Sequence, residues 1–159
     1  MMKTRLNYFQ HANNAMQALS GFAPYLAKSP LDKSLLELIY FRVSQINGCA
    51  FCLDMHTKEL RALGEEEHRL FVMDAWREAP FYSDRERAAL AFAEALTKVN
   101  LGHVADEVYD AAAAQFSEGE LIDLVIAIVA INSYNRLNIA FGSPMPVGSY
   151  KVGMFAAKH

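Results

Sequence analysis

The sequence predicts an all-α fold in a single domain that spans residues 1–159. Two serine–glutamate pairs three residues apart, Ser83 with Glu86 and Ser117 with Glu120, have the capping-box pattern that opens helices. Glycines and prolines punctuate the apolar segments, and no segment combines sustained strand alternation with hairpin turn signals. Because no linker, repeat or low-complexity segment interrupts the chain, one helical domain is expected.

The first half of the chain has well-marked helix boundaries. Residues 7–28 should form one or two helices, with a break near Gly21 or Pro24. Ser29 has the side chain of an N-cap residue, and Asp32 suits the positive N-terminal end of a helix dipole. A helix is therefore expected to begin just after Ser29.

The same signals place the remaining helices. The helix that follows Ser29 should end at about Asn47, because Gly48 suits a helix stop. Two prolines and two glycines make the tail, residues 143–159, a loop that can pack on a neighbouring subunit. Further helices are expected over residues 49–63, 65–74, 83–99, 105–116 and 117–141.

Composition and charge exclude several kinds of partner. Hydrophobic residues make up 53% of the chain and charged residues 21%, as in globular proteins. With a formal net charge of -3 and no block of lysine or arginine, neither nucleic acid nor a membrane is an expected partner. Residues 1–16 lack the apolar core of a signal peptide, and the apolar run 121–131 is shorter than the ~20 residues that span a bilayer. A cytoplasmic protein is therefore expected.

Two cysteines and a histidine fall on one stripe of the helix expected over residues 49–63. Cys49 and Cys52 are three residues apart and His56 is four beyond Cys52, so the three side chains share a face. In a reducing compartment, two cysteines this close indicate redox or metal chemistry. A helix N-terminus and a histidine both favour the thiolate, which is the nucleophilic form. A second cysteine can then convert an oxidised sulfur to a disulfide.

Glu37 is the acidic residue that we expect nearest to these sulfurs. It lies in the apolar sequence LLELIY, so its carboxylate should be at least partly buried, which suits a general acid or base. The break at Gly48 would let the two helices fold back on each other. Glu37 would then approach the stripe that carries Cys52 and His56.

Other interpretations of these residues compete with redox chemistry. A CxxC pair can be half of a zinc site, but zinc needs four ligands and no second cluster of ligands is present in the sequence. Buried, inert thiols are the other simple interpretation. Tyr134, Asn135 and Arg136 are polar residues inside an apolar helix, and we expect a structural role for them, at a subunit contact or in a network near the site.

A known family motif is similar to the segment ELIYFRVSQINGCAFCLDMH. The chain resembles the carboxymuconolactone decarboxylase and alkylhydroperoxidase D (AhpD-like) family, whose motif is a glutamate, a CxxC pair and a histidine four residues after the second cysteine. The motif falls on Glu37, Cys49, Cys52 and His56. The resemblance extends through most of the chain, and INSYNRLNIAFG is similar to the closing helix of the peroxidase-like members.

The resemblance implies a thiol-dependent peroxidase that reduces alkyl hydroperoxides without a metal or organic cofactor. It also implies a helical homo-oligomer, either a trimer or a hexamer, and re-reduction by a thiol or a dihydrolipoyl protein. Cys52 would be oxidised first and Cys49 would resolve it. Well-studied members carry a histidine where this chain has Phe51, which leaves proton delivery to His56 and Glu37. The family's decarboxylases lack the cysteine pair, which argues against that activity.

Electrostatics favour the same assignment of the two sulfurs. Cys49 lies nearer the expected helix start, where the dipole supplies about half a charge. A protonated His56 would supply a full charge close to Cys52, and this should have the larger effect in a partly dry site. Two other functions stay open: a general disulfide oxidoreductase or redox sensor that uses the same pair, and a non-catalytic oligomeric binding protein.

Overall fold

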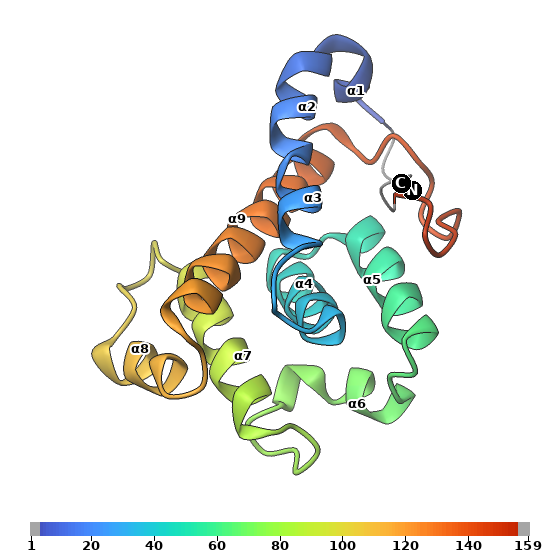
Figure 1. Cartoon of the computed structure of the whole chain (residues 1–159). Coiled ribbons are helices and arrows are strands. Elements are labelled where there is room, and N and C mark those ends of the chain that lie inside the picture. The colour runs from blue at the N-terminus through green and yellow to red at the C-terminus, as the bar shows by residue number, and fades with distance from the viewer. Residues whose placement is uncertain (1–3, 156–159) are drawn as a thin grey trace.

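Helices and connecting loops make up the computed structural model, which describes residues 4–155 and has no strand among them. Figure 1 shows α4 (Lys33–Asn47) at the centre. It packs against α5 (Ala50–Ala62) on one side and against α7 (Asp84–Thr97) and α9 (Glu118–Phe141) on the other (Figure 1). The predicted all-α fold is therefore confirmed.

Shorter helices complete the chain around this centre. The segment predicted as one or two helices forms three, with the break at Gly21 as expected, and Pro24 lies in the first turn of the third, where its missing N–H costs little. The helix predicted over residues 65–74 is divided into an α-helix and a 3-10 helix. The bounds are α1 (Tyr8–His11), α2 (Asn13–Ser20), α3 (Phe22–Leu26), α6 (Glu67–Phe71), η1 (Met73–Ala75) and α8 (Asp106–Ala113).

The start of α4 differs from the prediction. Asp32, not Ser29, is the N-cap residue, and its carboxylate accepts a hydrogen bond from the backbone N–H of Ser34 at 3.2 Å. The Ser29 hydroxyl instead donates to the buried carboxylate of Asp123 on α9, which also accepts a hydrogen bond from Tyr25. A buried carboxylate needs donors, and this need draws Ser29 away from the helix end.

Both predicted capping boxes are confirmed. Ser83 opens α7 and Ser117 opens α9, each with the reciprocal hydrogen bonds to the glutamate three residues later. Among residues 4–155, α9 is the one helix long and apolar enough to cross a membrane by these two criteria. It lies inside the fold, however, in contact with α3, α4, α7 and α8, and core helices of soluble proteins have the same length and composition.

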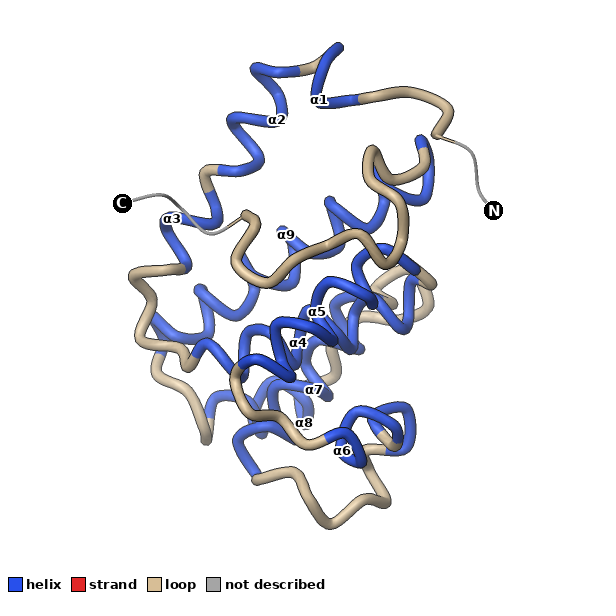
Figure 2. The backbone as a smooth tube through the Cα atoms, turned by 90° about the vertical axis from the view of Figure 1, so that its right-hand side faces the viewer, coloured by secondary structure: helices blue, strands red, loops and turns tan. Residues whose placement is uncertain are grey.

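The described part of the tail after α9, residues 143–155, is a loop as predicted, and it packs on α5 of its own chain. Figure 2 shows it running between the α1–α3 segment and α5. The carboxylate of Glu59 on α5 accepts hydrogen bonds from the Tyr150 hydroxyl and, at 2.7 Å, from the Gly153 N–H. Lys58 donates to the Gly148 carbonyl at 3.0 Å. Glu59 therefore anchors the tail.

We expect Glu59→Gln to loosen the tail in a pH-dependent way. Burial alone would raise the pKa of the Glu59 carboxyl, but hydrogen bonds from Gly153 and Tyr150 and the charge of Lys33 lower it below its ordinary value of 4.5. A lowered pKa stabilises the folded state above the ordinary value, and this contribution is lost as the pH falls through the native pKa. At neutral pH the variant should lose roughly 1–3 kcal/mol of the free energy of unfolding.

Urea unfolding across a pH series measures this effect. The difference between wild type and Glu59→Gln should shrink as the pH falls below 4.5, and the exposed Glu78→Gln should match the wild type at every pH. Equal stability of Glu59→Gln and wild type at neutral pH would contradict the prediction.

Candidate active site

The two cysteines lie where α4 reverses into α5. Gly48 ends α4 with a φ of 70°, a left-handed conformation that glycine adopts without steric cost, and Cys49 is the next residue and the N-cap of α5. Cys49 and Cys52 are joined by a disulfide, with their Cα atoms 5.3 Å apart. The Cys49 sulfur accepts a hydrogen bond from the backbone N–H of Cys52 at 3.4 Å. The turn thus places both sulfurs at a helix N-terminus.

Glu37 on α4 and His56 on α5 form a buried pair. The Oε2 atom of Glu37 lies 2.7 Å from Nδ1 of His56, and the two side chains are 12% and 6% exposed. A carboxylate at this distance holds the proton on Nδ1. The opposite ring nitrogen, Nε2, is buried without a hydrogen-bond partner among residues 4–155. The fold therefore brings Glu37 to the cysteine-bearing helix as predicted, and leaves one imidazole nitrogen free to exchange a proton.

A cavity of about 690 Å³ connects this pair with one of the two sulfurs. Cys52, Glu37 and His56 all line it, whereas Cys49 does not. Both cysteines are almost fully buried, at 2% and 1% exposed, so the cavity is the route by which a small molecule can reach the Cys52 sulfur. Most of the wall is aromatic or apolar, and it includes Phe9, Phe22, Phe51, Met55, Met145 and Phe155.

Phe51 and Tyr40 line the cavity beside Cys52 and His56. Phe51 is 7% exposed and supplies an apolar wall of the cavity. The Tyr40 ring lies 5.2 Å from the His56 ring, measured between centroids. Burial, and after it the charge of Glu37, raises the pKa of Tyr40 well above its usual range. The Tyr40 hydroxyl therefore stays protonated and can donate a hydrogen bond to a bound molecule.

Residues 134–136 have different positions in the structure. Tyr134 lines the cavity. Asn135 is fully buried and ties α9 to the end of α4, because its amide donates to Ser44 at 3.1 Å and accepts from Asn47 at 2.9 Å. Arg136 is exposed and bonds within α9. Asn135 thus has the structural role that we expected, close to the cysteine turn.

Sequence reasoning missed one contact to the Cys52 sulfur. Asn138 on α9 donates from Nδ2 to the Cys52 sulfur at 3.4 Å, and Tyr8 donates to Oδ1 of the same amide at 2.9 Å. A signal was present in the sequence, because Asn132, Asn135 and Asn138 follow each other at three-residue spacing in the long apolar helix. Such spacing places polar groups on one helix face.

The part of the chain that the structure describes brings no three His, Cys, Asp or Glu side chains together in a possible metal centre. The site therefore consists of a cysteine pair, a carboxylate–imidazole pair and an apolar cavity.

Comparison with known proteins establishes the family. The model of the carboxymuconolactone decarboxylase family matches residues 12–95, a range that contains Glu37, both cysteines and His56. The chain belongs to the carboxymuconolactone decarboxylase family. The uncharacterized protein YdfG of Bacillus subtilis (strain 168) is 41% identical to this chain over 142 residues, and the match covers 89% of this chain and 97% of YdfG.

Solved structures place the chain among the AhpD-like members of the carboxymuconolactone decarboxylase family. A protein of unknown function from Agrobacterium tumefaciens, named only provisionally as the antioxidant defence protein AhpD, is 40% identical with a TM-score of 0.86, covering 91% of this chain and 99% of that one. A peroxidase-related protein from Silicibacter sp. TM1040 is 26% identical with a TM-score of 0.71, covering 86% and 71%. The predicted family and AhpD-like fold are therefore confirmed.

Proposed function

We propose that this protein is a thiol-dependent peroxidase of antioxidant defence, a single AhpD-like domain over residues 1–159 that reduces alkyl hydroperoxides in the cytoplasm. The observation that carries the proposal is the cavity that joins the Cys52 sulfur to the buried Glu37–His56 pair. Its apolar walls suit the carbon skeleton of an organic hydroperoxide. The cavity is much larger than hydrogen peroxide needs, and we expect organic hydroperoxides to react faster.

The reaction begins with the reduced pair. The Cys52 thiolate attacks the terminal oxygen of the hydroperoxide, so that an S–O bond forms and the O–O bond breaks. The departing alkoxide takes a proton from Nε2 of His56 and leaves as the alcohol, and the Cys52 sulfur is left as a sulfenic acid. Glu37 stabilises the imidazolium that exists before this transfer.

The second step produces the disulfide seen in the structure. Cys49 gives its proton to His56, and its thiolate attacks the sulfenic sulfur of Cys52. The S–S bond forms while hydroxide leaves, and His56 returns the proton so that water is released. An external dithiol then reduces the disulfide by exchange, which restores both thiols. The net reaction consumes one hydroperoxide and one dithiol and yields an alcohol, water and a disulfide.

Burial of the sulfurs favours a peroxidase over a general disulfide oxidoreductase. A disulfide on a folded protein cannot reach sulfurs that are 2% and 1% exposed without large movement. A small hydroperoxide, a low-molecular-weight thiol or the thin arm of a dihydrolipoyl protein can enter the cavity. We therefore propose small thiols or a dihydrolipoyl protein as the reductant.

Thiol counting tests the proposed function directly. One equivalent of cumene hydroperoxide should remove both thiols of the reduced protein together and yield one equivalent of alcohol. Stopped-flow rates should be higher with cumene hydroperoxide than with hydrogen peroxide. If both thiols survive an excess of cumene hydroperoxide while a dithiol still reduces the oxidised protein, the peroxidase proposal fails and a disulfide oxidoreductase is favoured.

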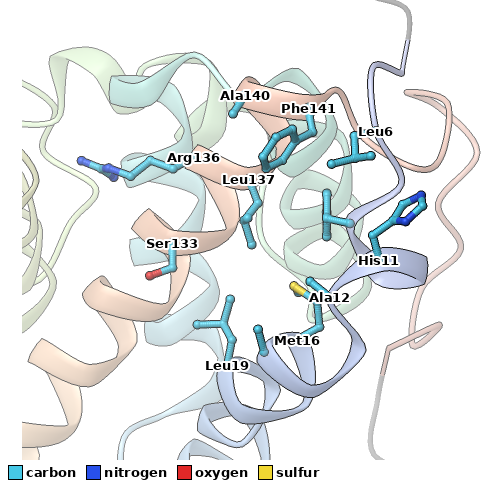
Figure 3. Close-up of a pocket in the computed structure, with 12 residues that line it drawn as sticks. Leu6, His11, Ala12, Met16, Leu19, Ser133, Arg136, Leu137, Ala140 and Phe141 are labelled. Atoms are coloured by element: carbon cyan, nitrogen blue, oxygen red, sulfur yellow. The ribbon is translucent and has the colours of Figure 1, made fainter.

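We also propose that the chain forms a trimer or hexamer. α9 exposes the apolar side chains of Ile122, Val129 and Ile139, which are 60%, 44% and 39% exposed. An open apolar hollow of about 590 Å³ adjoins α9, and Figure 3 shows Leu19 and Leu137 among the side chains that line it. A second copy of the chain would cover these surfaces.

Light scattering is expected to show this oligomer. A particle no larger than the 17.8 kDa monomer at micromolar concentration would contradict the prediction. Val129→Asp should dissociate the oligomer, because a carboxylate would be buried in the contact.

A further inference from the structure

We propose that Asn138 is a catalytic residue that holds the Cys52 sulfur as a thiolate, and that Tyr8 is the positioning residue that orients the Asn138 amide. This inference rests on the proposed role of Cys52 as the attacking sulfur. Nδ2 of Asn138 lies 3.4 Å from the Cys52 sulfur, and both residues are buried, at 6% and 1% exposed. An N–H group at this place donates more strongly to a thiolate than to a thiol or a disulfide.

Tyr8 decides which end of the amide faces the sulfur. The Tyr8 hydroxyl donates to Oδ1 of Asn138 at 2.9 Å, so the NH₂ group is turned toward Cys52. Tyr8 is 4% exposed, and burial, with a smaller effect of Tyr134, raises the pKa of its hydroxyl to about 12. At neutral pH the hydroxyl therefore keeps its proton and keeps donating. α1, a short helix far away in the sequence, thus orients a group on α9.

The Asn138 amide is the donor that directly contacts the Cys52 sulfur. Burial disfavours a thiolate unless hydrogen bonds or charges compensate. The backbone N–H of Cys52 donates to the Cys49 sulfur, and Nδ1 of His56 faces Glu37. Within residues 4–155, Asn138 is the one hydrogen-bond donor to the Cys52 sulfur. Each sulfur therefore accepts a hydrogen bond from a different donor, and Asn138 donates to the Cys52 sulfur and not to Cys49.

The position of Asn138 is held by neighbouring contacts on the same helix face. Asn132 and Asn135 precede it at three-residue intervals, and both accept hydrogen bonds from Asn47 at the end of α4, at 3.0 and 2.9 Å. Asn47 is two residues before Cys49. These contacts lock α9 to the turn that carries the cysteines, so the Asn138 amide is held in place before the sulfur is charged.

The inference predicts a shifted pH profile. In a Cys49→Ser background, which isolates the Cys52 sulfur, Asn138→Leu should move the midpoint of thiolate formation to higher pH. Alkylation by iodoacetamide at neutral pH should slow about tenfold, because a hydrogen bond to a charged group is lost. At a pH above both midpoints the two rates should converge, since the thiolate is then fully formed in either protein. Tyr8→Phe should shift the midpoint in the same direction by less.

Other titrating groups are the same in both proteins. The cavity contains Tyr8, Lys33, Glu37, Tyr40, His56, Glu59, Tyr134 and Tyr150, and Asn138→Leu replaces none of them, although it removes the acceptor of the Tyr8 hydroxyl. Ultraviolet absorbance of the thiolate and the alkylation rate therefore report the loss of the amide donor. Asp123→Asn is the control on the same helix, because it weakens buried hydrogen bonds from Ser29 and Tyr25 and leaves the contacts between α9 and the cysteine turn unchanged. It should lower stability without moving the midpoint.

Several outcomes would overturn the inference. One is a folded Asn138→Leu protein in which the midpoint of thiolate formation has not moved. Another is an alkylation rate that is lowered equally at every pH, because this indicates a purely structural effect. If Asn138→Leu does not fold, an unmoved midpoint in Tyr8→Phe would overturn the inference in its place. Neither readout uses a hydroperoxide, so a shifted midpoint would support the inference even if peroxidase activity proved absent.

Discussion

Replacing Cys52 with serine is expected to abolish the fast reaction with organic hydroperoxides. The remaining sulfur, Cys49, does not line the cavity and is 2% exposed, so hydroperoxide has no direct route to it. Stopped-flow measurements on the reduced variant should give a rate no higher than that of a simple free thiol. This is the largest effect that we expect from any single substitution, because a serine hydroxyl cannot replace a thiolate as nucleophile.

Cys49→Ser should behave differently, and the contrast assigns the two sulfurs. The variant is expected to react once with hydroperoxide, stop as a sulfenic acid at Cys52 and over-oxidise in excess oxidant, because no second thiol resolves it. Dimedone trapping followed by mass spectrometry locates the sulfenic acid. A dimedone adduct on Cys49 in the Cys52→Ser protein, formed at the wild-type rate, would reverse the assignment.

Two physical effects compete in this assignment. The N-terminus of α5 favours a thiolate at Cys49, whose sulfur accepts the Cys52 N–H. Access to the cavity, the neighbouring His56 and the Asn138 amide all favour reaction at Cys52. A nucleophile must first meet its substrate, so we expect access to the cavity to outweigh the helix N-terminus. Cys52 is therefore the sulfur that we expect to attack.

Local signals predicted most of the helices, and the exceptions depend on contacts distant in the sequence. Ser83 and Ser117 cap helices as expected, since a capping box needs only residues three apart. Ser29 is an equally good cap by local rules, but its hydroxyl is taken by Asp123, 94 residues later. No local pattern could show that α9 would bring a buried carboxylate to this position.

The residues of the candidate site also fall into a group that the sequence predicted and a group that it did not. Spacing placed Cys49, Cys52 and His56 on one face, and the family motif added Glu37, which the structure places 2.7 Å from His56. Asn138 contacts Cys52 across 86 residues, and Tyr8 contacts Asn138 across 130. These contacts depend on how α1 and α9 pack against the α4–α5 turn. The spacing of the asparagines indicates a polar face on α9, but it does not show which helix that face contacts.

Glu37→Gln is expected to retain the fold and to slow hydroperoxide reduction by ~10²-fold or more, the loss typical of a removed general acid–base partner. The amide is nearly isosteric with the carboxylate and its oxygen can still accept the Nδ1–H of His56, 2.7 Å away in the wild type. It lacks the negative charge that stabilises the imidazolium, however, so His56 would hold the proton needed by the alkoxide less often.

Comparison with a second variant shows whether Glu37 acts through His56. Glu37 and His56 should work as one unit, so the double variant Glu37→Gln/His56→Gln should be about as slow as His56→Gln alone. Independent roles would instead multiply the two losses. Circular dichroism and thermal melts check that each variant is folded, and stopped-flow rates with cumene hydroperoxide over a pH series give the comparison. A wild-type rate in Glu37→Gln would leave Glu37 with a structural role, because a carboxylate that takes part in proton transfer cannot be replaced by an amide without loss.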